Sequence, residues 1–251
     1  MKINHWFFLQ LMRGVFNLTC KIDSAQLARL PKKGPAILLT NHVNFLEMPI
    51  MYSLMQDWPI AALVKFETWR SSLLTTLFER SKMVPVHRGE PDRTGLRLAQ
   101  QSLEEGHILA VLPEGTRDNG SLKKGHPGVS LIALRAKVPI WPLVYYGGEF
   151  FWRNLPHFKR TDFHIVLGNP FRLDANGESL SREVVQEMAD EIMYQLAALL
   201  PAAYRGLYSD FNQARQTYLR FDAGVSSNLD RSPRSNSVIG KGFRGNLSPQ
   251  L

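Results

Sequence analysis

Cysteine is almost absent from this chain, which has only Cys20 among its 251 residues. A single thiol cannot form an intrachain disulfide or a metal site built from several cysteines, and it suits a reducing compartment. A long apolar run is also missing. The apolar stretch near the start is interrupted by Gln10, Arg13 and Asn17, whereas a transmembrane helix needs about 20 mostly apolar residues. Neither a disulfide scaffold nor a membrane-spanning segment at this end is expected.

Acidic residues are fewer than basic ones, 22 against 30, and the formal net charge is +8. This excess favours anionic partners, which include nucleic acids, anionic lipid headgroups and phosphorylated substrates. No recognised nucleic-acid-binding motif accompanies the charge, so we expect no nucleic-acid partner.

The first 18 residues have the pattern of an amphipathic helix. Gln10, Arg13 and Asn17 are spaced to share one narrow helical face, while apolar side chains cover most of the remainder. Such a helix can lie in the plane of a membrane surface or pack on the protein's own core, and the segment favours neither alternative. We treat residues 1–30 as an N-terminal amphipathic segment.

From residue 31 onward, short apolar runs alternate with helical patterns. Buried strands are predicted at 36–40, 60–64, 84–86, 108–112, 140–145 and 163–167, and helices at 94–105, 130–137 and 181–200. Gly106 suits a helix C-cap, Ser181 an N-cap and Pro201 a helix stop. This alternation predicts an α/β fold with a largely parallel mixed sheet flanked by helices, over residues 31–221. Residues 222–251 are polar, and we expect a disordered tail there.

Two polar motifs directly follow predicted strands. In the first, His42 is followed five positions later by Glu47. A histidine at a strand end can take a proton from a hydroxyl, and a nearby carboxylate can fix its tautomer. In the second, Glu114-Gly115-Thr116-Arg117, glycine permits a tight turn and arginine matches phosphate. Taken singly, each motif is better explained as an ordinary surface loop or turn.

Five motifs in a fixed order are more specific than either alone. They are Asn41-His42 with Glu47, Lys65-Phe66-Glu67, the run 84–89, the run 112–117 and the run 138–143. This ordered set, which covers roughly residues 31–170, resembles the glycerophospholipid acyltransferase family that includes 1-acylglycerol-3-phosphate acyltransferases. The resemblance implies that His42 is the general base and that Glu47, where the family most often has Asp, is its partner. The substrate-binding positions that it implies are Arg88, Glu114, Gly115, Thr116, Arg117 and Pro139.

The same resemblance implies roles for these positions. Arg88 would bind the acceptor phosphate, the Glu114–Arg117 turn the glycerol-phosphate headgroup, and Pro139 would lie on the acyl-chain side. An acceptor hydroxyl would attack an acyl thioester directly, without an enzyme nucleophile, a metal or another cofactor. The donor would be acyl-CoA or acyl carrier protein, and the acceptor a lysophospholipid.

The resemblance also implies a location and leaves alternatives open. The implied location is peripheral or monotopic, on the cytoplasmic face of a membrane. The alternatives are a different lipid acceptor and a non-catalytic lipid-binding scaffold on the same fold.

Overall fold

The structure is a computed structural model and describes residues 5–43, 46–65, 83–86, 93–115 and 120–230. Its centre is a seven-stranded sheet with the strand order β1-β7-β6-β2-β5-β3-β4. The strands are β1 (Cys20–Asp23), β2 (Ala36–Thr40), β3 (Ile60–Lys65), β4 (Met83–Val86), β5 (Ile108–Val111), β6 (Ile140–Tyr146) and β7 (Thr161–Leu167). None of the helices in these ranges is long and apolar enough to span a membrane.

The five strands from β6 to β4 are parallel, while β7 runs antiparallel to β6 and β1 runs parallel to β7. The predicted mixed, largely parallel sheet is therefore confirmed. The reversal at β7 has a geometric consequence. The edge at which β2, β5 and β6 end is also the edge at which β7 and β1 begin.

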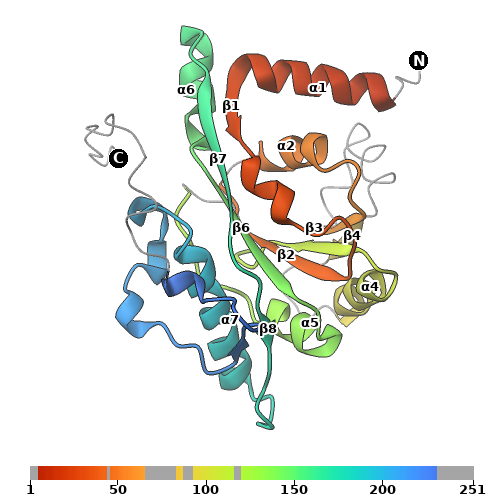
Figure 1. Cartoon of the computed structure of the whole chain (residues 1–251), viewed down its shortest axis with the longest axis vertical. Helices are drawn as coiled ribbons and strands as arrows, with labels where there is room; N and C mark the ends of the chain where they lie inside the picture. The colour runs from red at the N-terminus through yellow and green to blue at the C-terminus, as the bar shows by residue number, and fades with distance from the viewer. Residues whose placement is uncertain (1–4, 44–45, 66–82, 87–92, 116–119, 231–251) are drawn as a thin grey trace.

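Helices cover both faces of the sheet (Figure 1). On one face, Ile37 and Leu39 of β2 join a core with α4 (Arg93–Glu104), α5 (Gly128–Ala136) and α7 (Arg182–Ala197). On the other face, Ala36 and Leu38 join a core with α1 (His5–Thr19), α2 (Glu47–Leu54) and the 3-10 helix η1 (Ala25–Arg29). All five residues of β2 are buried because successive side chains enter opposite cores.

Helix α1 packs on the body of the protein through part of its surface. Phe16 is buried in the second core, and the Arg13 guanidinium donates to the Ser53 carbonyl at 2.7 and 2.9 Å. The Arg13 side chain therefore contacts the body of the protein, although the sequence pattern places it on the polar face of the helix. Within residues 10–19 of the helix, whose side chains the structure describes, the exposed large apolar ones are Leu11, Val15 and Leu18.

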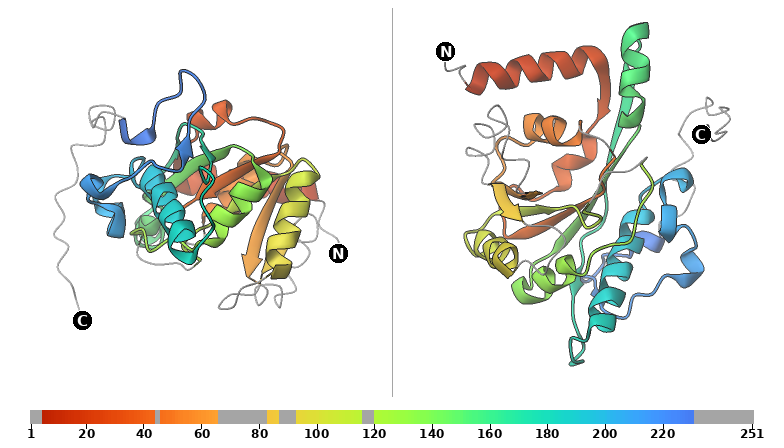
Figure 2. Two further views of the ribbon diagram at one scale, coloured as in Figure 1. Left: turned by 90° about the horizontal axis from the view of Figure 1, so that it is seen from below. Right: turned by 180° about the vertical axis from the view of Figure 1, so that it is seen from behind.

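The C-terminal part adds a second, two-stranded sheet of β8 (Arg172–Leu173) and β9 (Leu219–Arg220), together with short 3-10 helices (Figure 2). The structure corrects the expected start of the tail at residue 222. Asn228 is fully buried, and its side-chain amide donates to Gln195 at 3.0 Å and to the Asn169 carbonyl at 3.1 Å. Composition alone missed these tertiary hydrogen bonds. Residues 231–251 lie outside the described part.

Candidate functional site

His42 lies two residues beyond the end of β2, in the middle of the sheet. The side chain of the preceding residue, Asn41, extends the ladder to β6. Its amide donates to the Tyr145 carbonyl at 2.9 Å, and its carbonyl accepts from the Tyr145 amide at 2.8 Å. Asn41 is buried, so this two-point contact fixes the chain at the place where it leaves the sheet. In open α/β sheets, ligands bind at this carboxyl edge of the strands.

The His42 ring is paired with Glu47, the first residue of α2. Nδ1 of His42 lies 3.0 Å from Oε2 of Glu47, while Oε1 accepts from the Val43 amide. Both side chains are buried. A carboxylate can only accept, so Nδ1 carries the hydrogen and Nε2 of the neutral ring keeps its lone pair. An imidazole held in this way can take a proton from a substrate hydroxyl.

Glu114 holds His42 from the neighbouring strand. It follows β5, is buried, and accepts from the His42 amide at 3.2 Å through Oε1 and from the Lys123 amide at 2.9 Å through Oε2. Burial raises the pKa of this carboxyl group, although the two amide hydrogen bonds oppose the rise. Both carboxylate oxygens thus serve the backbone. The geometry makes Glu114 a positioning residue for His42 and for the segment that begins at residue 120.

Gly115 forms the turn after Glu114. Its φ of +66° lies in the left-handed region, and a Cβ atom here would come within 2.9 Å of the His126 ring. Only glycine fits both requirements without strain, as the sequence pattern predicts for a tight turn.

The segment after this turn is held by distant parts of the chain. The Leu122 amide donates to the Tyr204 carbonyl at 3.0 Å, and the Gly125 amide donates to the Tyr208 hydroxyl at 3.1 Å. Tyr204 in turn donates to Glu149, which follows β6, and burial together with this contact raises the pKa of Tyr204. Tyr208 lies 83 residues from Gly125 in the sequence, so no local motif could indicate this contact.

The structure brings together only some of the residues predicted from sequence. His42, Glu47, Glu114 and Gly115 lie at one edge of the sheet. Pro139 does not join them, because its carbonyl accepts from the Ile37 amide at the start of β2. Ile37 precedes His42 by five residues, and five residues extend over about 15 Å in a strand. Arg88, Thr116 and Arg117 lie outside the described residues.

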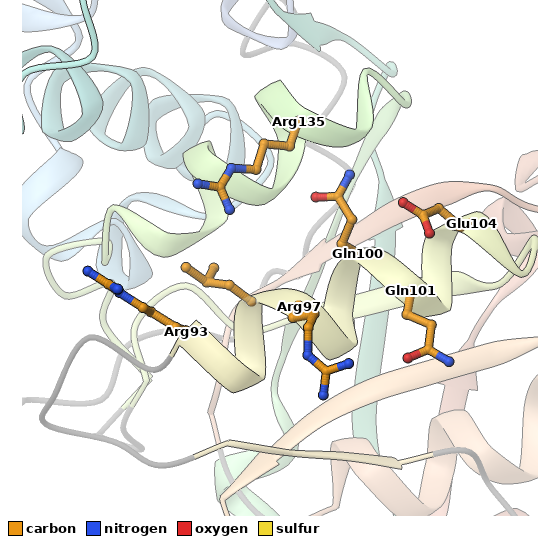
Figure 3. A pocket seen from close by; sticks show the side chains of 7 residues that line it. Arg93, Arg97, Gln100, Gln101, Glu104 and Arg135 are labelled. Carbon is orange, nitrogen blue, oxygen red and sulfur yellow. The ribbon is translucent and has the colours of Figure 1, made fainter.

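A separate groove of about 700 Å³ lies between α4 and α5. Figure 3 shows Arg93 and Arg97 on α4 and Arg135 on α5 around it, together with Glu104 and two glutamines. Among the residues that the structure describes, none of the three arginines has an ion-pair partner within 4.0 Å. The groove is therefore cationic, but its lining does not include His42, Glu47 or Glu114.

Comparisons with known proteins give one consistent result. The family model "Acyltransferase" matches residues 21–146, which include His42, Glu47 and Glu114. The 1-acyl-sn-glycerol-3-phosphate acyltransferase of Bacillus subtilis is 21% identical over 195 residues, which are 77% of this chain and 95% of that protein. A putative 1-acyl-sn-glycerol-3-phosphate acyltransferase of Caenorhabditis elegans is 23% identical over 191 residues, or 74% of this chain and 64% of that protein.

A solved structure agrees in fold. The 1-acyl-sn-glycerophosphate acyltransferase of Thermotoga maritima superposes with a TM-score of 0.53 at 20% identity, over 74% of this chain and 77% of that one. These matches confirm the family resemblance that the five ordered motifs indicated.

Proposed function

The chain belongs to the acyltransferase family, and from this premise we propose that it moves a fatty acyl group from an acyl thioester to the hydroxyl of a lysophospholipid. The proposed acceptor is 1-acylglycerol-3-phosphate, and the product is then phosphatidic acid. The observation that carries the proposal is the His42–Glu47 pair at the carboxyl edge of β2. The names of the relatives support the choice of acceptor.

The proposed reaction uses the two substrates alone. Nε2 of His42 removes the proton from the acceptor hydroxyl while the hydroxyl oxygen attacks the thioester carbonyl carbon. Glu47 keeps the imidazole in the required tautomer and stabilises the imidazolium that forms. The tetrahedral intermediate then collapses, the carbon–sulfur bond breaks, and the imidazolium proton goes to the departing thiolate.

The substrates would be held by charge as well as by shape. By family resemblance, Arg88 and Arg117 bind the acceptor phosphate, while Glu114 positions His42 through the backbone. Acyl-CoA and acyl carrier protein are both anionic, so the cationic groove between α4 and α5 suits either donor equally.

A panel assay tests this function. Labelled acyl groups are offered on CoA and on acyl carrier protein to lysophosphatidate, lysophosphatidylcholine and monoacylglycerol. We expect transfer to lysophosphatidate with at least one donor and much weaker transfer to monoacylglycerol, which lacks the phosphate. If no donor and acceptor pair gives product while the protein still binds these lipids, the non-catalytic scaffold replaces the enzyme as the best account.

We also propose that the protein is peripheral on a membrane, with α1 lying at the surface. The exposed apolar side chains Leu11, Val15 and Leu18 support this placement. Deleting the helix would be a poor test, because Phe16 and Arg13 are part of the fold. The double variant Leu11→Gln and Val15→Gln removes two of these three exposed apolar side chains and leaves Phe16 and Arg13 unchanged, and it should weaken liposome binding.

A matched control and a contrary result complete that test. The control changes the exposed polar residues Gln10 and Asn17 to alanine on the same helix. Liposome binding that falls equally in both double variants would contradict the proposed role of the apolar surface.

A further inference from the structure

Exposed apolar side chains are concentrated on two elements of the molecule. In the described part of the chain, eight large apolar side chains are exposed, and six of them lie on α1 or in the connection between β6 and β7. The connection consists of the 3-10 helix η3 (Gly148–Phe150), α6 (Phe151–Asn154), the 3-10 helix η4 (Leu155–His157) and the residues up to β7. Its exposed members are Trp152, Leu155 and Phe158, and Phe158 is 100% exposed. We call residues 151–159 the β6–β7 tip.

The β6–β7 tip meets the end of α1. Strands β1 and β7 are parallel and Cys20 pairs with Thr161, so Leu18 and Phe158 each lie within three residues of the same register position. The Arg160 guanidinium donates to the Cys20 carbonyl at 2.6 Å, which ties the two segments together. Figures 1 and 2 show α1 and α6 at the same end of the molecule. Their exposed apolar side chains therefore lie at the same end of the molecule.

This region lies at the same edge of the sheet as His42. Tyr146, the last residue of β6, pairs with His164, so β7 begins three residues beyond the end of β6. The β6–β7 tip consequently projects past the carboxyl edge at which His42 leaves β2. A surface that binds this tip would also face the candidate active site.

The backbone of the tip is fixed, and it presents the ring of Phe158 to solvent. Phe158 ends η4 in a left-handed conformation with a φ of +53°, and the turn is held by hydrogen bonds from the Phe158 amide to the Leu155 carbonyl at 3.1 Å and from the Lys159 amide to the Asn154 carbonyl at 3.2 Å. The Phe158 ring buries none of its surface in the protein. An aromatic ring that is fully exposed on a backbone turn held in place indicates a contact outside the chain.

The charge of the tip points to an anionic surface. Residues 151–160 include Arg153, Lys159 and Arg160 and no acidic residue. Arg153 and Lys159 are exposed. Aromatic rings interspersed with basic side chains are typical of the headgroup region of a bilayer, where the rings enter the acyl boundary and the cations meet phosphates.

We propose that the β6–β7 tip is a second membrane-contact element, which inserts Trp152, Leu155 and Phe158 into the interface of an anionic bilayer beside α1. The inference rests on the proposed function, because it describes how the proposed enzyme is oriented on the membrane. With α1 and the tip both on the bilayer, the carboxyl edge and His42 face the lipid, and a lysophospholipid acceptor reaches the site without crossing water.

Vesicle binding by the full chain tests the proposal. The variant combines Trp152→Gln with Phe158→Asn, since asparagine tolerates the left-handed conformation. The control combines Leu180→Gln with Leu207→Gln, two exposed apolar residues outside both elements. On phosphatidylcholine vesicles that contain phosphatidylglycerol, we expect the tip variant to bind about ten-fold or more weakly and the control to bind like wild type, because burial of large apolar side chains drives interfacial binding.

Binding is measured without acyl donor, so a chain that lacks acyltransferase activity still tests the tip. Weaker binding by the tip variant, with an unchanged melting temperature, supports the proposal. Equal binding by the tip variant and wild type overturns it. Absence of vesicle binding by wild type also overturns it, and would direct attention to a protein partner for the tip.

An activity measurement separates this inference from the proposed function. If the protein is the proposed enzyme, the tip variant should retain transfer to a short-chain lysophosphatidate dispersed in water and lose transfer to the long-chain acceptor in vesicles. Loss of both activities to the same extent would contradict a role in membrane contact.

Discussion

Replacing Glu47 by glutamine tests the catalytic pair with almost no change in shape. The two carboxylate oxygens have different tasks, because Oε2 faces Nδ1 of His42 at 3.0 Å and Oε1 accepts from the Val43 amide. Glutamine has one acceptor and one donor group at these places. If its NH₂ group faces the Val43 amide, two donors oppose each other. If it faces Nδ1, the proton moves to Nε2 and the ring loses the lone pair that it needs.

Either placement of the amide should greatly reduce catalysis. General acid–base catalysis contributes about 10²- to 10⁴-fold, so we expect kcat/KM for acyl transfer to fall by about 10²- to 10³-fold. This decrease corresponds to about 2.7–4.1 kcal/mol of transition-state stabilisation. Glu47→Asp keeps the charge but shortens the side chain by one methylene, and its activity should lie between those of the glutamine variant and wild type.

The assay needs a correction for folding and a matched control. Glu47 is buried, and an unsatisfied buried amide costs about 1–3 kcal/mol of stability, so rates are divided by the folded fraction from circular dichroism. The control is Glu105→Gln, since Oε2 of Glu105 lies 3.6 Å from the Nδ1 of His107, outside the candidate site. A Glu47→Gln enzyme within three-fold of wild type would refute the assigned role of the carboxylate.

Three further variants test the surroundings of His42. Asn41→Ala leaves two buried backbone groups of β6 without partners and should lower the free energy of unfolding by about 2–4 kcal/mol in urea titrations; a loss below about 1 kcal/mol would contradict the bridging role. Burial raises the pKa of Glu114 above its ordinary 4.5, so the folded chain binds more protons than the unfolded chain and this group's contribution falls as pH rises above 4.5. Glu114→Gln should therefore flatten the fall of melting temperature with pH, and an unchanged slope would count against the shift. Gly115→Ala, strained and in contact with His126, should lose more activity than Gly224→Ala, which meets the same strain in open space, and equal losses would show that the contact is unimportant.

Much of the sheet could be predicted from sequence because its strands are short, buried on both faces and therefore continuously apolar. The runs at 36–40 and 108–112 are the clearest cases, and both correspond to central strands. Strand β1 was missed because its sequence, Cys-Lys-Ile-Asp, has neither an apolar run nor a Gly or Pro boundary. Edge strands with mixed polarity carry little local signal.

The candidate site was predictable where its residues are close in sequence. Glu47 follows His42 by five positions, and the expected contact of its carboxylate with the imidazole occurs at the start of α2. Glu114 is different, because its hydrogen bond to the His42 amide spans 72 residues and depends on the adjacency of β2 and β5. Motif order indicates that such residues belong together, but it does not distinguish a substrate ligand from a positioning residue.

The most direct test of the central claim is acyl transfer to lysophosphatidate by His42→Ala, compared with His107→Ala. His107 is also a buried histidine beside a glutamate, so the two variants create similar cavities and differ in their distance from the site. Rates are compared per folded molecule. We predict a loss of about 10²- to 10⁴-fold for His42→Ala and at most a few-fold loss for His107→Ala. Wild-type transfer by His42→Ala, or equal losses in both variants, would contradict the assignment of His42 as the general base.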